Sequence, residues 1–268
     1  MKRVYLEITD ACNLNCPFCR YDKGNSFMPL ADIDCYTDQI GKVCSYIYLH
    51  ILGEPLLHPQ FEEIMDMLDR KGLKLQLVTN GTLLDRYPGL LKHACLRKLS
   101  ISIHSVSHLD IGQSYFDTID ALIENNEDKT IELRFYNEET LSEDLIIYKK
   151  DLISRYGLSQ TSKKRSCQLK NNVYLYEETF FRWPDIKDPV IGFEGTCLGA
   201  IDMIAVNHEG KVCLCCLDPK AINCIGDLKK DSLDAILQSE AYLNCINGFR
   251  QRKIVSDLCS RCSYRLRF

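Results

Sequence analysis

The stretch TDACNLNCPFCRY, from Thr9 to Tyr21, decides how the rest of the chain is interpreted. It places Cys12, Cys16 and Cys19 as C-x3-C-x2-C, directly after an apolar run that predicts the first β-strand. Three thiolates on one loop can bind three irons of a 4Fe-4S cubane and leave the fourth iron without a protein ligand. A zinc knuckle or buried structural cysteines are the alternatives, but structural zinc takes four nitrogen or sulfur ligands and no fourth stands nearby. The spacing therefore predicts a cubane cluster with one open iron.

Around this loop, the first two-thirds of the chain alternates short β-like runs with helical patterns, which is typical of βα units on a parallel sheet. Apolar residues at helical spacing from Phe61 to Leu68, followed by Gly72 as a C-cap, predict one helix. The polar stretch at about 160–172 predicts a loop. Six strands are predicted, at 4–8, 46–51, 73–79, 99–104, 131–136 and 173–176, with further helices at about 32–45, 83–94, 115–126 and 142–156. The expected fold class is α/β, a partial (β/α)6 TIM-like barrel.

Beyond Pro189 the pattern changes to dense cysteines, glycine-marked turns and a helix near 232–249. We therefore expect a barrel at 1–189 and a small second domain at 190–268.

Bulk composition excludes several classes of function. A formal charge of -4 over 268 residues gives no basic footprint for duplex nucleic acid. The N-terminus lacks the apolar core of a signal peptide, and no apolar run approaches the roughly 20 residues that span a bilayer. We expect a cytoplasmic protein without a membrane partner. In that reducing compartment, 15 cysteines indicate metal binding or catalysis more than disulfides.

Polar residues on the predicted strands lie out of phase with their apolar neighbours. In a barrel wrapped by helices, apolar residues face the helices and polar ones face the lumen. The lumen is therefore expected to be a polar binding site near the carboxyl ends of the strands. The residues in this phase are Tyr5, Glu7, Tyr48, His50, Gln76, Ser102, His104, Glu132, Arg134, Tyr174 and Tyr176.

Taken together, these motifs resemble the radical S-adenosylmethionine (radical SAM) superfamily. The resemblance implies that the open iron chelates the amino and carboxylate groups of adenosylmethionine. Phe18 would lie against the adenine, and Gly53 with Glu54 would form the GGEP-like motif that binds the ammonium, although Leu52 replaces its first glycine. Further cofactor contacts are implied for Asn80, in a TNG element, and for Ser102 and His104 at the end of the fourth strand. We also expect Arg134 to pair with the methionine carboxylate, because a guanidinium binds a carboxylate as a bidentate fork.

The C-terminal cysteines form a second set. Cys197 begins a C-x12-G-x4-C pattern through Gly210 to Cys215, and Cys259 and Cys262 follow as C-x2-C. The arrangement resembles the twitch domain, a shortened SPASM domain that carries one auxiliary 4Fe-4S cluster. Cys213, Cys216 and Cys224 compete with Cys215 as the second ligand, and a four-cysteine zinc ribbon remains the alternative. No role is assigned to Cys35, Cys44, Cys95, Cys167 and Cys245.

Three reaction classes remain open. Peptide maturation is disfavoured, because the first strand begins at Val4 and leaves no room for a leader-binding domain. Oxidation of an aminocyclitol or polyol is the second class, since the cysteine spacing resembles that of 2-deoxy-scyllo-inosamine dehydrogenase. The third is fragmentation, and here the favoured hypothesis is queuine lyase, which cleaves a C-N bond and releases 7-aminomethyl-7-deazaguanine. A non-enzymatic redox or sensor protein is the alternative outside catalysis.

The queuine hypothesis makes a specific use of the lumen. Its carboxylates, Glu7 and Glu132, would accept hydrogen bonds from the edge of the base. The remaining substrate-binding candidates are Tyr48, His50, Gln76, Tyr174 and Tyr176. The expected partners are this small molecule and an external one-electron donor such as flavodoxin or ferredoxin.

Overall fold

The computed structural model describes residues 1–19, 23–158, 166–180 and 182–268. In this part of the chain, a single ten-stranded sheet has the order β10-β9-β8-β1-β2-β3-β4-β5-β7-β6. The six predicted strands are all present, as β1 to β5 and β7. The strands are β1 (Arg3–Leu6), β2 (Tyr46–Tyr48), β3 (Lys74–Thr79), β4 (Leu96–Ile101), β5 (Thr130–Tyr136), β6 (Ser166–Lys170), β7 (Val173–Glu178), β8 (Met203–Val206), β9 (Lys211–Cys213) and β10 (Cys224–Asp227).

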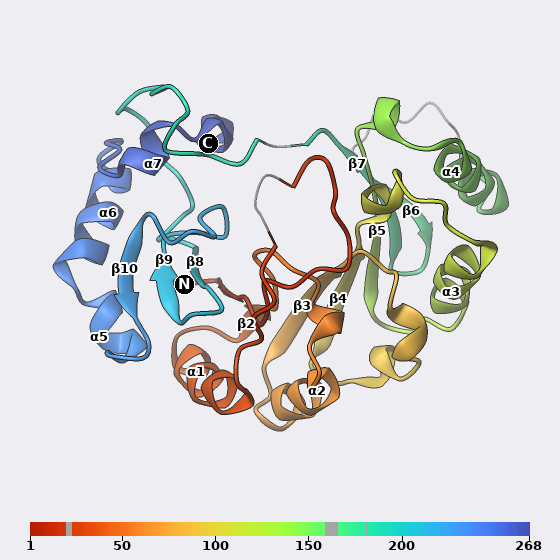
Figure 1. Ribbon diagram of the computed structural model, residues 1–268, viewed down its shortest axis with the longest axis horizontal. Coiled ribbons are helices and arrows are strands. Elements are labelled where there is room, and N and C mark those ends of the chain that lie inside the picture. Colours follow the sequence, from red (N-terminus) through yellow and green to blue (C-terminus); the bar gives the residue numbers. More distant parts are fainter. Residues whose placement is uncertain (20–22, 159–165, 181) are drawn as a thin grey trace.

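The sheet is curved but open. All pairings from β8 through β1 to β7 are parallel, whereas β6, β9 and β10 pair antiparallel at the two ends. Because β10 and β6 are edge strands that do not meet, the barrel is partial, as predicted. Figure 1 shows the strands as an arc with helices outside it and the segment after β1 on its inner side.

Helices cover the outer face of the arc (Figure 1). Short 3₁₀ turns follow several strands and bring the chain back across their ends. The α-helices are α1 (Leu30–Val43), α2 (Phe61–Arg70), α3 (Gln113–Glu124), α4 (Glu143–Arg155), α5 (Leu233–Leu237), α6 (Glu240–Arg250) and α7 (Asp257–Ser260), and the 3₁₀ turns are η1 (Pro55–Leu57), η2 (Leu84–Arg86), η3 (Leu90–Lys92), η4 (Ile103–Val106), η5 (Glu138–Thr140) and η6 (Ser263–Arg267).

Three local predictions were wrong. The segment 83–94 forms two 3₁₀ turns rather than a helix, because Pro88 and Gly89 interrupt it. The helix expected near 232–249 is two helices, since Ser239 caps a new one by accepting a hydrogen bond from the Tyr242 amide. The loop expected at 160–172 contains β6, which pairs antiparallel with β7, while its first part lies outside the described residues.

The core forms where the predicted alternation places it. On β5, Ile131, Leu133 and Phe135 are fully buried beneath the helices, and Glu132 and Arg134 between them face the other way. β3 alternates in the same manner. A parallel sheet with one helix-covered face therefore leaves its inner face to polar side chains.

Residues on the C-terminal side of Pro189 extend the same sheet. β8 pairs in parallel with β1, with Tyr5 opposite Ala205, so the second cysteine-rich region continues the sheet from the first strand. The boundary near Pro189 stays a prediction.

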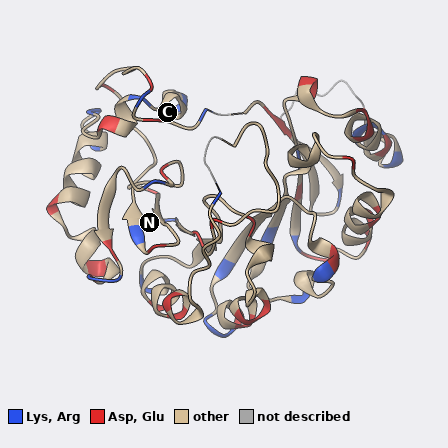
Figure 2. Cartoon of the chain, viewed as in Figure 1, with Lys and Arg blue, Asp and Glu red and all other residues tan. Residues whose placement is uncertain are grey.

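The outer surface carries charges of both signs, interspersed around the arc (Figure 2). Among the described residues, no helix has the length and apolar character needed to cross a membrane.

Candidate functional site

A cavity of about 460 Å³ lies on the inner face of the sheet and joins the two cysteine sets. Cys12, Cys16 and Cys19 line one part, and Cys197, Cys215, Cys259 and Cys262 line another. All 15 cysteines are free thiols. Predicted site residues that also line it are Phe18, Tyr48, His50, Gly53, Glu54, Gln76, Asn80, Ser102, His104 and Arg134.

The first cysteine loop fits a cubane cluster. Its three thiols face the cavity, and the amide of Leu14 donates to Cys12 Sγ at 3.4 Å. Cys16 Sγ lies 3.4 Å from the carbonyl oxygen of Ser105 in η4. Burial raises the pKa of the Cys16 thiol to about 12, so that a bound metal must supply the charge that holds it as a thiolate.

The loop after β2 packs directly on the first cysteine loop. Gly53 has φ +72°, and an added Cβ would lie 2.3 Å from the carbonyl oxygen of Thr9. The amide of Glu54 donates to the carbonyl oxygen of Ala11 at 2.8 Å. Only glycine permits this approach of two backbones, which explains the single glycine that this GGEP-like motif retains.

Glu54 connects the ends of β2 and β3. Its carboxylate accepts hydrogen bonds from the Leu56 amide at 3.1 Å, the Thr79 hydroxyl at 2.8 Å and the Asn80 amide at 2.7 Å. Burial nevertheless raises its pKa to about 7, against these hydrogen bonds, which favour the charged form. The Asn80 side chain in turn donates to Asn13 at 2.9 Å, so the ends of β2 and β3 are both tied to the cysteine loop that follows β1.

An aromatic wall stands beside this loop. His104 stacks on Tyr136 with ring centroids 4.5 Å apart and planes 3° apart. Phe18 stacks on Phe180 at 4.3 Å. Burial, reinforced by the charge of Arg134, lowers the pKa of His104 to about 4, so its ring is neutral near pH 7. Flat neutral rings of this kind can stack with an adenine.

The second cysteine set fits a cluster better than a single zinc ion. Four thiolates around zinc at about 2.3 Å would lie about 3.8 Å from one another. Among the described residues, no group of three or more cysteine sulfurs lies within 4.8 Å of each other. Cys213 is fully buried and Cys224 is exposed, and neither lines the cavity, whereas Cys215 does. Cys216 also lines it, so the choice of Cys215 stays a prediction.

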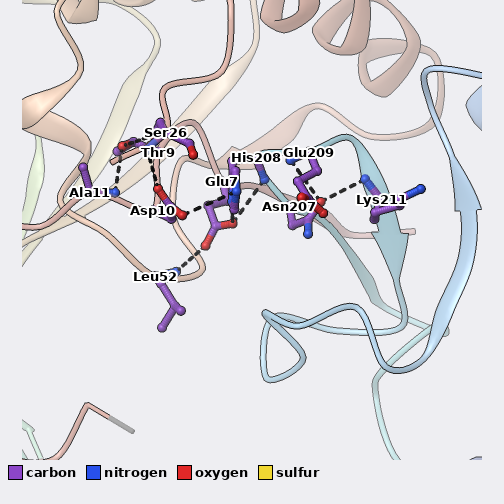
Figure 3. A network of polar contacts seen from close by, with 10 residues as sticks. All are labelled: Glu7, Thr9, Asp10, Ala11, Ser26, Leu52, Asn207, His208, Glu209 and Lys211. Carbon is purple, nitrogen blue, oxygen red and sulfur yellow. Dashed lines mark hydrogen bonds and ion pairs between the residues drawn. The ribbon is translucent and has the colours of Figure 1, made fainter. Parts of the chain in front are cut away.

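Glu7 does not line the cavity, contrary to expectation. Figure 3 shows the polar contacts that it makes instead. Its carboxylate accepts from the Leu52 amide at 2.9 Å, from the His208 amide at 3.1 Å and from His208 Nδ1 at 2.8 Å. Its side chain is buried and these three donors occupy both oxygens. The strand phase is correct, but the turn between β8 and β9 covers the residue.

Glu132 is also absent from the cavity wall, and two cations flank it. It pairs with Lys98 on β4 and with Arg134 on its own strand, and Arg134 also donates to the Ser100 hydroxyl at 3.2 Å. Burial alone would raise the pKa of Glu132, but the charges of Arg134 and Lys98 outweigh it and hold that pKa low. Arg134 does line the cavity, already paired, and its contact with a methionine carboxylate stays a prediction.

Tyr174 and Tyr176 on β7 were expected in the lumen and do not line the cavity. Tyr176 instead lies behind Tyr136, with ring centroids 6.0 Å apart. β7 is too far along the arc for its side chains to reach the space between the cysteine sets.

Sequence reasoning missed several lining residues. Arg3 shares the strand phase of Tyr5 and could have been found by extending the predicted strand by one residue. Cys216 lines the cavity beside Cys215, but its neighbours in sequence gave no reason to separate the two. Trp183 and Tyr264 come from irregular segments that no periodicity identifies.

The open βα barrel, with a three-cysteine loop after its first strand and a second cysteine set on the same cavity, defines an iron-sulfur protein. Residues 6–133 match the model of the radical SAM superfamily, and residues 197–263 match SPASM, an iron-sulfur cluster-binding domain. The chain belongs to the radical SAM superfamily, with adenosylmethionine, a 4Fe-4S cluster and an auxiliary iron-sulfur cluster as its cofactors. The predicted cofactors are thereby confirmed.

The curated relatives named here match less than half of the chain. The GTP 3',8-cyclase of Aquifex aeolicus is 32% identical over 116 residues, which cover 40% of this chain and 36% of that protein. The tungsten-containing aldehyde ferredoxin oxidoreductase cofactor-modifying protein of Pyrococcus furiosus is 34% identical over 89 residues, 31% and 25% of the two chains. These matches thus span about a quarter to a third of the relatives' length.

Solved structures match nearly the whole chain. BtrN in an open conformation has a TM-score of 0.57 at 13% identity and covers 98% of this chain and 92% of its own. The enzyme anSMEcpe with bound AdoMet has a TM-score of 0.62 at 12% identity, over 98% and 86%. SuiB of Streptococcus suis has 0.63 at 13%, over 97% and 71%. At these identities the likeness shows a shared fold.

Proposed function

We propose that this chain abstracts a hydrogen atom from a small polar molecule held between its two cysteine sets. Adenosylmethionine, bound at the first cluster, supplies the 5'-deoxyadenosyl radical for that step. The observation that carries the proposal is one cavity that joins both cysteine sets and is lined by Tyr5, Tyr48, His50 and Gln76. A one-electron donor of the flavodoxin or ferredoxin type provides the electron.

The role of the protein side chains is to hold and orient the cofactor. The wall of Phe18, His104 and Tyr136 would stack against the adenine, and the loop of Glu54 would meet the ammonium. Fixing both ends of the cofactor aims its reactive carbon at one C-H bond of the substrate. Neutral, buried rings such as His104 also keep water from that carbon.

Within this class, we propose queuine as the substrate and C-N cleavage to 7-aminomethyl-7-deazaguanine as the reaction. The side of the cavity formed by Tyr5 and Tyr48, whose ring centroids lie 4.7 Å apart, offers aromatic faces to a planar base. The carboxylates of Glu7 and Glu132 are already paired with protein groups, so the side-chain amide of Gln76, in their place, would form the hydrogen bonds to the edge of the base. That amide both donates and accepts, and it makes no hydrogen bond within the described residues.

Oxidation of an aminocyclitol is the second candidate, supported by the near full-length fold likeness to BtrN, which has been solved in complex with AdoMet and 2-DOIA. The two candidates differ in the planar base, which queuine alone would offer to the rings of Tyr5 and Tyr48, and this difference favours the lyase.

The test is anaerobic incubation of cluster-reconstituted protein with adenosylmethionine, a reductant and either queuine, guanine or an aminocyclitol. We expect queuine alone to stimulate 5'-deoxyadenosine and to yield 7-aminomethyl-7-deazaguanine. A Cys16→Ala protein is the control for background cleavage. Formation of a ketone from the aminocyclitol would replace the lyase assignment by a dehydrogenase. If no small molecule stimulates 5'-deoxyadenosine formation, both the lyase and the dehydrogenase assignments are wrong.

A further inference from the structure

Arg3 is a cavity arginine without a counter-ion. Two further arginines line the cavity among the described residues, and both have partners. Arg134 pairs with Glu132, and Arg265 donates to the carbonyl oxygens of Cys259, Glu194 and Gly192 at 2.8–2.9 Å. The Arg3 guanidinium lies 5.9 Å from the centroid of the Tyr48 ring. No carboxylate within the described part of the chain forms an ion pair with it.

A second polar side chain with an unpaired buried atom lines the same cavity. Buried side-chain nitrogen and oxygen atoms without a hydrogen-bond partner in the described chain are few, and they include Arg3 Nε and His50 Nδ1. An unsatisfied buried donor and a half-buried cation without a counter-ion both destabilise the folded chain. Native proteins keep such groups where a ligand completes them.

The surroundings of Arg3 define what could complete it. Tyr5 and Tyr48 flank it with tilted rings, and His50 stands edge-on to Tyr5 at 5.4 Å. Lys2, next in the chain, points out of the cavity and pairs with Asp202 at 2.8 Å with 74% of its side chain exposed. Aromatic rings and a guanidinium therefore share one wall of the cavity, which suits a molecule that has a planar face and an acceptor oxygen.

We propose that Arg3 anchors the substrate by donating hydrogen bonds to an acceptor oxygen, either a ring carbonyl or an oxyanion. The proposal rests on the proposed function, in that the substrate must occupy this cavity. It selects substrates with a carbonyl or an anionic oxygen over those that offer only hydroxyl and ammonium groups.

Tryptophan fluorescence can test this by binding alone, because Trp183 is the single tryptophan and lines the cavity. The ligands are a matched pair, 7-aminomethyl-7-deazaguanine and the same compound with hydrogen in place of the 6-oxo group. Wild-type protein should bind the carbonyl compound tighter by tenfold to a hundredfold, as for a charge-assisted hydrogen bond. Arg3→Met should abolish that preference, Arg3→Lys should keep part of it, and Lys2→Met, which removes a neighbouring charge outside the cavity, should retain all of it.

Inorganic phosphate is a second probe, which separates this proposal from the queuine assignment. Phosphate binding that is lost in Arg3→Met, in a protein that does not turn over queuine, would uphold the anchor and reject that substrate. Equal preference for the carbonyl compound in wild-type and Arg3→Met proteins would overturn the anchor while leaving turnover untouched. If neither probe binds in an Arg3-dependent way, or if Arg3→Met shifts only the potential of the auxiliary cluster, Arg3 serves the cluster and the proposal is wrong.

Discussion

His208 joins the second cysteine region to the end of β1 through a buried carboxylate. Its Nδ1 donates to Glu7 at 2.8 Å and its Nε2 lies 3.4 Å from Asp10, which also accepts from the Ser26 amide (Figure 3). The hydrogen bond to Glu7 raises the pKa of His208, against partial burial, which would lower it. This imidazole therefore connects the loop of the first cluster with the turn between β8 and β9.

Replacing His208 by Leu removes the side-chain bond and leaves the Glu7 carboxylate with two backbone donors. Loss of one charge-assisted hydrogen bond costs about 1.5–3 kcal/mol in unfolding free energy. A chain of this size should then show a fall in Tm of roughly 3–12 °C. Thermal unfolding of the anaerobically reconstituted protein measures it, with His108→Leu, an exposed histidine, as the matched control.

The contribution of His208 to the free energy of unfolding should depend on pH, and the direction of its pKa shift fixes the sign. The folded pKa of His208 lies above its unfolded value, so its contribution is complete below the unfolded pKa and is lost as pH rises through the folded one. The charges that face it are those of Glu7, Asp10 and Glu209. The stability gap between wild type and His208→Leu should therefore be wide at pH 6 and narrow at pH 9. A gap that is equal at both values, or that widens with pH, would refute this account of the contact.

Three further predictions concern the clusters. Changing the three cysteines of the first loop to Ala should leave about half of the iron and abolish 5'-deoxyadenosine formation; zinc at the second site of the wild type would contradict a second cluster. Cys215→Ser should lose the auxiliary cluster's iron and absorbance while Cys216→Ser keeps both, and the reverse result would reassign the ligand. Gly53→Ala should prevent assembly of the first cluster, because its Cβ would meet the Thr9 carbonyl, whereas Gly72→Ala, with nothing within 4 Å, should cost only about 1 kcal/mol of backbone strain. Normal iron content in Gly53→Ala would show that the two loops can separate.

Strand phase predicted several of the side chains that line the cavity, but not which residues of the same phase lie elsewhere or are already engaged by a partner. Tyr48, His50 and Gln76 reach the cavity as expected. Glu7 and Glu132 have the same phase, yet each is engaged by a partner that is remote in sequence, His208 in one case and Lys98 in the other. The alternation of a strand is a local property, whereas the partner of a buried carboxylate depends on the tertiary fold.

The strands of the second region were missed for a related reason. β8, β9 and β10 have four, three and four residues, and they lie among glycine-marked turns and dense cysteines in which no alternation was recognised. Their stability comes from pairing with one another and with β1, about 200 residues away along the chain. The cysteine spacing around them was informative because a metal site constrains sequence more strongly than a short strand does.

The pairing of β1 with β8 explains why both cysteine sets share one cavity. The first set begins six residues after β1, at Cys12, and the second surrounds β8, with Cys197 before it and Cys215 after β9. Because Arg3 to Leu6 are in register with Met203 to Val206, a backbone ladder and not a flexible linker fixes the separation of the two sets. Arg3, Tyr5 and Cys216 lie on that ladder or beside it and face the space between the sets. The size of a substrate is therefore limited by the sheet itself, and its chemistry by the few side chains that the ladder presents.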